Sequence, residues 1–317
     1  MDLMHELFNI VLPPINIILI LCFLPPYLVF KILYYIKRHI SIENVAGKVV
    51  LITGAAKGIG EQLAYEYARR GACLVLVDIK EDRLGPVVNK ARQLGSPDVI
   101  SIGADVSNIE DSQRFIEGAI NHFGRLDHLV NNAGVGTDSI TNDNVFIKPR
   151  RVMEINYWGT VYSTHFAIPH LSKSKGKIMV TASGLGWFPT PKTGFYGASK
   201  AAVINYYESL RSEIGCDIGI TIVTPGLIKT DMSDELEKNK GVNLIVPLES
   251  KESCAKAMVN SVCRGDKYLV EPSWIRILFS WKVFYPEIVE FGNHWAIFRN
   301  RGTPKKSPIQ SPEAKAE

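Results

Sequence analysis

The sequence predicts an α/β fold with a doubly wound, mostly parallel sheet of seven strands and helices on both faces. Short apolar runs alternate with helical segments over residues 44–272, a rhythm typical of parallel strands joined by helices. The runs are short and mainly apolar, as expected for strands that are covered on both faces. A glycine-rich turn follows the first run directly, which makes the predicted domain Rossmann-type.

The first 43 residues form a separate segment, which we predict to be an apolar membrane anchor. No charged side chain occurs from Leu7 to Phe30, and proline pairs at 13–14 and 25–26 enclose the run INIILILCFL. As a helix this run would be about 15 Å long, roughly half the thickness of the hydrocarbon core. Because prolines remove backbone donors and bend the chain, we interpret the run as the deep part of a bent, half-immersed anchor.

Two other interpretations of this segment stay open. One is a continuous spanning helix that is kinked at the prolines. The other is a signal peptide, which Asp2 and Glu6 disfavour because they lie where a signal peptide carries basic residues. Tyr34, Lys37 and Arg38 follow the apolar run, where interfacial aromatic and basic residues would lie. With either type of anchor, we expect the main domain on the cytosolic side.

Seven predicted strands follow in order. They are VVLIT from residue 49, CLVLV from 73, VISI from 99, HLV from 128, KIMVTA from 177, IGITIVT from 218 and KYLV from 267. The segments between them are predicted helices, among them Ile59–Arg70 after the first strand. Ser107 and Glu110 have the spacing of a capping box and predict the start of the third helix.

The first strand ends in TGAAKGIG, which places Gly54, Gly58, Ile59 and Gly60 at the turn from strand to helix. Glycine is needed there because a Cβ would block the tight turn and the approach of a pyrophosphate to the helix amides. Lys57 precedes its glycine and no Gly-Lys-Ser/Thr follows, which excludes a Walker phosphate loop. The turn therefore predicts a dinucleotide site.

Two charged residues bear on the choice of dinucleotide. Asp78 closes the second strand, where a carboxylate can accept hydrogen bonds from the adenosine ribose and repel a phosphate. Lys57 favours NADP, since a cation in the glycine turn could bind the extra phosphate. We favour NAD, because a phosphate beside an unscreened carboxylate costs more than a lysine left in water. NADP remains the alternative.

Composition excludes several classes of protein. The 36 Lys and Arg residues are spread along the chain and matched by 32 Asp and Glu, so nucleic acid is not an expected partner. The five cysteines include no C-x-x-C pair, which argues against a disulfide framework and against a zinc site. We therefore expect no metal, and a domain that works in a reducing compartment.

The motifs TGAAKGIG, NNAG, YGASK and PG occur in this order, and over about residues 44–270 the chain resembles the classical short-chain dehydrogenase/reductases. The resemblance implies a catalytic tetrad of Asn156, Ser183, Tyr196 and Lys200. Besides the glycine turn and Asp78, it implies cofactor contacts at Asp105, Val106, Asn132, Ala133, Gly134, Tyr196, Lys200, Pro225 and Gly226.

One branch of that family is more similar than the rest. The proline-bearing N-terminus, FAIPHL, FYGASKAAV and DIGITIVTPGLI resemble the steroleosins, plant hydroxysteroid dehydrogenase-like proteins of seed oil bodies. Members typically carry Ser-Ser in the glycine turn and basic residues after the second strand, which implies NADP. This chain has Ala56-Lys57 in the turn and Asp78-Ile79-Lys80 after the strand, a departure that puts the cofactor preference of the branch in doubt here.

Under this resemblance, Tyr196 is the base that takes the proton of the alcohol. A free phenol titrates near 10, so this role asks for a pKa lowered by about three units. The Lys200 ammonium, one helical turn away, and the oxidised nicotinamide would supply that shift. Lys200 would also hold the nicotinamide ribose. Ser183 would hydrogen-bond the substrate oxygen, and Asn156 would organise a path that returns the proton to solvent.

The remaining segments carry weaker signals. Trp187, Phe188 and Phe195 suit the wall of a flat apolar ligand, or ordinary loop packing. Residues 273–298 form an aromatic-rich amphipathic segment that could face a membrane, act as a lid or form a dimer contact. We expect the polar tail, 299–317, to be disordered.

The predicted function is that of a membrane-anchored oxidoreductase, which interconverts a lipophilic secondary alcohol and its ketone with NAD or NADP. The resemblance favours a sterol or steroid substrate and allows a homodimer. The alternative is a structural coat of lipid droplets that retains the fold without turnover. We expect the chain at the surface of lipid droplets or the membrane of the endoplasmic reticulum, with its catalytic domain facing the cytosol.

Overall fold

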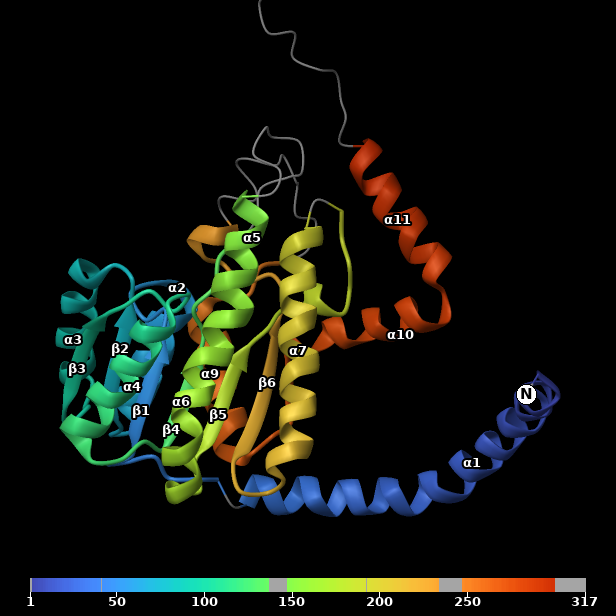
Figure 1. Ribbon diagram of the computed structural model, residues 1–317, viewed down its shortest axis with the longest axis horizontal. Coiled ribbons are helices and arrows are strands. Elements are labelled where there is room, and N and C mark those ends of the chain that lie inside the picture. The colour runs from blue at the N-terminus through green and yellow to red at the C-terminus, as the bar shows by residue number, and fades with distance from the viewer. Residues whose placement is uncertain (1, 41, 137–146, 192, 234–246, 300–317) are drawn as a thin grey trace, which may run out of the picture.

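One seven-stranded sheet forms the centre of the protein (Figure 1). The computed structural model describes all residues except 1, 41, 137–146, 192, 234–246 and 300–317. The strand order is β3-β2-β1-β4-β5-β6-β7, and every pair of neighbours is parallel. All seven predicted strands are confirmed. Their bounds are Val49–Thr53, Cys73–Asp78, Val99–Gly103, His128–Asn131, Lys177–Thr181, Gly219–Pro225 and Tyr268–Glu271 for β1 to β7.

Helices cover both faces of the sheet (Figure 1). Helices α2, α3 and α9 share one apolar core with the strands, and α4, α6 and α7 share the other. Ile52 of β1 belongs to the first core and its neighbour Leu51 to the second, because successive side chains of a strand point to opposite faces. The bounds are Gly58–Arg69 for α2, Leu84–Gln93 for α3, Ile109–Phe123 for α4, Gly159–Ser174 for α6, Gly194–Ile214 for α7 and Lys251–Arg264 for α9.

The capping box predicted for α4 is wrong by one residue. Asn108 is the N-cap, and its side-chain oxygen accepts a hydrogen bond of 2.9 Å from the amide of Asp111. The hydroxyl of Ser107 instead donates to the carboxylate of Asp105 at 2.7 Å. Asn and Ser are both good caps, so the local sequence did not choose between neighbouring starts.

The N-terminal segment is a single helix, α1 (Asp2–Ile40), which runs through both proline pairs. It is continuous and bent (Figure 1), which agrees with the bend predicted from the prolines and has the continuous form of the kinked-helix alternative. Each proline removes only one donor and its φ suits a helix, which allows a bend without an end. Residues Leu3–Arg38 are long and apolar enough to cross a membrane, and the apolar side chains of α1 are exposed. This helix suggests membrane anchoring.

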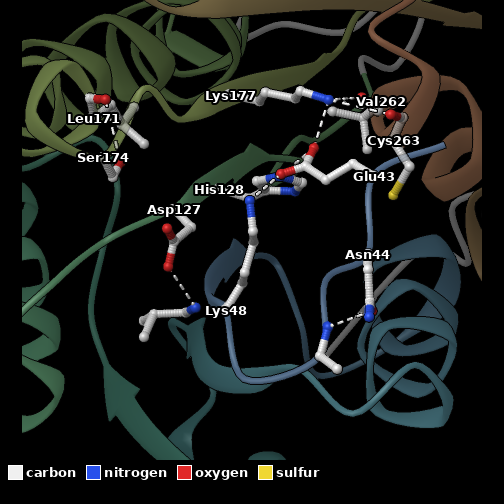
Figure 2. Close-up of polar contacts among 12 residues, drawn as sticks. Glu43, Asn44, Lys48, Asp127, His128, Leu171, Ser174, Lys177, Val262 and Cys263 are labelled. Carbon is white, nitrogen blue, oxygen red and sulfur yellow. Dashed lines mark hydrogen bonds and ion pairs between the residues drawn. The ribbon is translucent and has the colours of Figure 1, made fainter. Parts of the chain in front are cut away.

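Charged contacts at the amino edge of the sheet join α1 and the residues that follow it to the domain. Arg38 forms an ion pair of 3.4 Å with Asp266, which precedes β7. Three residues beyond α1, the carboxylate of Glu43 lies 3.3 Å from Nε2 of His128 and 2.5 Å from Nζ of Lys177 (Figure 2). It also pairs with Lys48.

The electrostatics of Glu43 follow from this setting. Burial by itself raises the pKa of the Glu43 carboxyl, but the hydrogen bonds and charges of His128, Lys177 and Lys48 outweigh it and hold the pKa well below its usual range. Lys177 also donates to the backbone oxygens of Val262 and Cys263 at the end of α9. Glu43 therefore ties the linker to β1, β4, β5 and α9.

We predict that Glu43→Gln lowers the free energy of unfolding by about 2 kcal/mol at pH 7, because two half-buried ammonium groups lose their counter-charge. The folded pKa of Glu43 lies below the unfolded value of 4.5, so the difference from wild type is fully present above about pH 5 and shrinks as the pH falls. Urea unfolding of the detergent-solubilised chain measures it. Glu110→Gln, at an exposed site of α4, is the control, and equal stability of the two variants would contradict the assigned role.

Candidate active site

The four residues of the predicted tetrad meet at the carboxyl edge of the sheet. Ser183 lies two residues beyond β5, while Tyr196 and Lys200 lie one turn apart on α7. Asn156 lies in a π-helical turn, Glu154–Trp158, between α5 (Ile147–Met153) and α6. Such turns disturb the regular helix and are frequent at functional sites.

Lys200 is the buried cation of this cluster. Its side chain is only 3% exposed, and its ammonium donates a hydrogen bond of 2.8 Å to the backbone oxygen of Thr181. The same nitrogen lies 5.8 Å from the centre of the Tyr196 ring. Burial lowers the pKa of Lys200 to about 8, because the charged form loses its hydration. Lys200 is therefore still mostly protonated at pH 7.

The titration of Tyr196 differs from the sequence-based expectation. Burial raises the pKa of the phenol above its usual value, and a hydrogen bond with Ser183 lowers it only in part. The protein's own groups therefore do not produce the predicted lowering, because removing a phenolate from water costs more than one hydrogen bond returns. Further positive charge beside the ring is needed for Tyr196 to act as a base near neutral pH.

Asn156 is fully buried and its amide is fully engaged. Its oxygen accepts from the amide of Val135 at 2.8 Å, and its nitrogen donates to the Val135 oxygen and to Ser199 Oγ, both at 3.0 Å. Ser199 precedes Lys200 on α7. Asn156 thus joins the chain beyond β4 to the helix that carries Tyr196 and Lys200.

The glycine turn leaves no room for side chains. A Cβ on Gly60 would lie 2.0 Å from the backbone oxygen of Gly54, and a Cβ on Gly54 would lie 2.8 Å from Ala133 Cα. Gly54 and Gly58 have φ values of +67° and +64°, which side-chain-bearing residues rarely adopt. Lys57, the N-cap residue of α2, makes no capping hydrogen bond with its side chain. The backbone amides in the first turn of α2, that of Ile59 among them, are therefore suited to a pyrophosphate.

Asp78 is held beside this turn. One carboxylate oxygen accepts from the amide of Ala56 and the other from the amide of Lys80, both at 3.0 Å. This fixes the carboxylate at the corner where the adenosine ribose of a dinucleotide would lie. Lys57 points elsewhere and forms an ion pair of 3.1 Å with Asp231, in the segment after β6.

The strand ends next to the turn carry the other predicted contacts. The side-chain nitrogen of Asn132 donates to the backbone oxygens of Thr53 and Gly54, and the amides of Asn132 and Ala133 both donate to Thr53 Oγ1 at 3.1 Å. A Cβ on Gly134 would lie 3.3 Å from the Lys200 ammonium. This segment therefore lies between the glycine turn and the tetrad.

The last predicted contacts border the same edge on either side. Asp105 and Val106 follow β3, and one Asp105 oxygen is engaged by the amide and hydroxyl of Ser107. Pro225 ends β6, and the amide of Gly226 donates to the Glu271 oxygen of β7 at 2.7 Å. Every predicted cofactor residue is thus found along the carboxyl edges of β1 to β6.

A buried network that the sequence interpretation missed holds this arrangement. The side-chain nitrogen of Asn131, at the end of β4, donates to Thr164 Oγ1 at 2.9 Å and to the Tyr207 hydroxyl at 2.8 Å. Its oxygen accepts from Ser163 Oγ at 2.7 Å. The available signal was a set of hydroxyl residues three and four apart, Thr160, Ser163 and Thr164, on one side of a helix.

Helices α10 (Arg276–Phe284) and α11 (Pro286–Arg299) cover the loop that follows Ser183. Phe279 meets Trp187 edge to face at 5.8 Å, and Lys282 donates to the Trp187 oxygen at 2.6 Å. Asn293 donates to the Pro189 oxygen. Many apolar side chains of these helices remain exposed, among them Ile277, Trp281, Val283, Phe284, Ile288 and Phe291.

Comparison with known families agrees with this geometry. The family model described as short chain dehydrogenase matches residues 48–241. The chain belongs to the short-chain dehydrogenase family. It is therefore an NAD(P)-dependent oxidoreductase of that family, and its curated relatives make it hydroxysteroid dehydrogenase-like.

Those relatives are plant proteins. The chain is 45% identical over 318 residues to 11-beta-hydroxysteroid dehydrogenase A of Sesamum indicum, covering 96% of this chain and 91% of that protein. It is 49% identical over 292 residues to 11-beta-hydroxysteroid dehydrogenase-like 4A of Arabidopsis thaliana, covering 91% and 98%. These relatives confirm the predicted resemblance to the plant hydroxysteroid dehydrogenase-like branch.

Solved structures share the fold. A short-chain dehydrogenase/reductase from Burkholderia phymatum, solved in complex with NAD, superposes with a TM-score of 0.66 at 25% identity, covering 77% of this chain and 96% of that one. Carveol dehydrogenase from Mycobacterium avium, also solved with NAD, gives a TM-score of 0.64 at 25% identity, covering 72% and 97%. The predicted Rossmann-type fold is confirmed.

We predict that Lys200→Met makes the dinucleotide-free protein more stable by about 2 kcal/mol at pH 7, because a buried ammonium is held at the expense of its hydration. The folded pKa of Lys200, about 8, lies below the unfolded value of 10.5. The wild type therefore gains stability as the pH rises from about 8 to 10.5, and its stability approaches that of Lys200→Met. Denaturant unfolding at pH 7 and pH 10 measures this. Lys173→Met, at an exposed site, should change neither value; a destabilised Lys200→Met would contradict the prediction.

Proposed function

We propose that the chain is a membrane-anchored dehydrogenase that interconverts a lipophilic secondary alcohol, of sterol or steroid type, and its ketone. The observation that carries this proposal is the cluster of Ser183, Tyr196 and Lys200 beside the glycine turn. In it a hydroxyl, a phenol and a buried ammonium lie together, and the Ser183 hydroxyl opposes the rise in the pKa of Tyr196 that burial causes. The names of the plant relatives support a steroid-like substrate.

Each residue of the cluster has a separate role in the proposed reaction. A bound NAD or NADP accepts the hydride of the carbinol carbon, or supplies it in the reverse direction. Tyr196 takes the alcohol proton, and Ser183 holds the same oxygen so that the carbinol hydrogen faces the cofactor. The Lys200 ammonium favours the phenolate of Tyr196 by its charge and is placed to bind the nicotinamide ribose. Asn156 orients α7 through Ser199 and Val135.

NAD is the cofactor that we favour. The Asp78 carboxylate is fixed at the ribose corner by two backbone amides, and a phosphate there would meet its full charge. Lys57, the cation that would favour NADP, is paired with Asp231.

The proposed location is the surface of lipid droplets or the endoplasmic reticulum, with the catalytic domain in the cytosol. Helices α1, α10 and α11 extend to the same side in the view of Figure 1, and all three have exposed apolar side chains. Because α10 packs on the loop beyond Ser183, a membrane at these helices would bring a lipid-soluble alcohol close to the site.

A structural coat of lipid droplets that keeps the fold is the rival function. It would need neither an open glycine turn nor a buried lysine beside the tyrosine, and burying that lysine costs stability. Titration of the solubilised chain with NAD and with NADP separates the two functions, since a coat protein has no need to bind either dinucleotide.

We predict that Tyr196→Phe reduces kcat for steroid alcohols at least about a hundredfold, because the base is lost while the fold and the cofactor contacts remain. Steady-state kinetics and dinucleotide titration measure the two effects separately. Tyr268→Phe, an exposed tyrosine on β7, is the control and should keep full activity. Persisting activity in Tyr196→Phe would show that another group is the base.

We predict that Asp78→Ala raises the ratio of kcat/KM for NADP to kcat/KM for NAD by about tenfold, because the charge that repels the extra phosphate is removed. The ratio cancels any general loss of activity that follows from the two lost amide contacts. Asp98→Ala, at the amino end of β3, is the control. An unchanged ratio in Asp78→Ala would contradict the choice of NAD.

A further inference from the structure

An ion pair joins the glycine turn to the segment after β6. Lys57 Nζ lies 3.1 Å from the carboxylate of Asp231, although the two residues are 174 positions apart. Both side chains are more than half exposed. The pair lies near the Asp78 carboxylate, because the amide of Ala56, the residue before Lys57, donates a hydrogen bond to Asp78.

The backbone around Asp231 holds it in this place. The amide of Thr230 donates to Ser233 Oγ at 2.9 Å, and the same hydroxyl donates back to the Thr230 oxygen at 2.7 Å. The amide of Lys229 donates to the Glu249 oxygen at 2.8 Å. The Thr230 methyl also lies 3.8 Å from where a Cβ of Gly58 would be. This segment therefore packs on the glycine turn through contacts other than the ion pair.

The charges nearby make Asp231 the counter-ion of several cations. The hydrogen bond and charge of Lys57 lower the pKa of Asp231, and Lys251 and Arg83 add smaller effects in the same direction. Lys251 is itself paired with Glu61 of α2 at 3.3 Å. Lys57 is the cation of this group that belongs to the glycine turn and could turn toward a ribose phosphate.

We propose that Asp231 is a positioning residue for cofactor selection, which holds Lys57 away from the 2′-phosphate position and so favours NAD over NADP. This inference rests on the proposed function, since it needs a dinucleotide at the glycine turn. Asp78 repels the phosphate directly. Asp231 acts through Lys57, by occupying the ammonium that would otherwise bind that phosphate.

The effect of Asp231 is modest because the pair is exposed. Ion pairs of this kind contribute up to about 1 kcal/mol, which corresponds to roughly a fivefold change in an equilibrium constant. Asp231→Asn should therefore lower the dissociation constant of NADP about two- to fivefold and change that of NAD less than 1.5-fold. Asp231→Glu, which can still reach Lys57, should retain the wild-type ratio.

The experiment is calorimetric titration of the full-length, detergent-solubilised chain with NAD and with NADP, without substrate. It compares the wild type, Asp231→Asn, Asp231→Glu and Lys57→Gln, together with Asp231→Asn in the Lys57→Gln background. Asp217→Asn, at an exposed position before β6, is the matched control. In the Lys57→Gln background we expect Asp231→Asn to improve NADP binding less than twofold, because no lysine is left to release.

Two results would overturn the inference while leaving the proposed function intact. One is an Asp231→Asn variant with the NADP to NAD ratio of the wild type. The other is a gain in NADP affinity that persists when Lys57 is replaced, since Asp231 would then act by its own charge or through loop structure. A wild-type chain that binds neither dinucleotide would overturn the proposed function, and this inference with it.

Discussion

The geometry of the active site depends on one buried amide, that of Asn131 at the end of β4. Its side chain is 1% exposed and bonds to Ser163 and Thr164 on α6 and to Tyr207 on α7. A buried amide without partners costs about 1–3 kcal/mol, so the two helices are held to the central strand in one arrangement. The same α7 carries Tyr196 and Lys200, and α6 continues from the turn that carries Asn156. The network therefore fixes the relative positions of the residues in the candidate tetrad.

The two edges of the sheet serve different purposes because all the strands run the same way. The amino edge is closed by charges, with Glu43 between two lysines and a buried histidine, and this edge receives the anchor helix. The carboxyl edge carries the glycine turn and the tetrad. A parallel sheet thus separates attachment from chemistry by the full length of its strands. Helix α1 thus joins the domain at one edge, and the candidate active site lies at the other.

The burial of the charged Lys200 side chain lowers the stability of the folded protein. Lys200 is buried with a backbone oxygen as its partner rather than a carboxylate, so the positive field of its ammonium is left uncompensated in the candidate site. A carboxylate partner would neutralise that field. At the adenosine end the opposite arrangement occurs, since Lys57 is paired with Asp231 and the Asp78 carboxylate carries the net local charge. For both Lys200 and Lys57, the hydrogen-bond or ion-pair partner of the ammonium determines whether its positive charge is compensated.

Apolar runs and glycine spacing in the sequence determined the seven strands, the Rossmann-type sheet and the glycine turn, because each depends on residues that are neighbours in the chain. Ordered motifs such as YGASK placed the candidate tetrad as well. Only the tertiary structure decided that Asn108 caps α4, that α1 continues through its prolines, that burial raises the pKa of Tyr196, and that Lys57 pairs with Asp231. The cap and the helix were close choices between local alternatives of similar free energy. The pKa and the ion pair arise from desolvation and from contacts between distant segments, which exist only once the chain has packed.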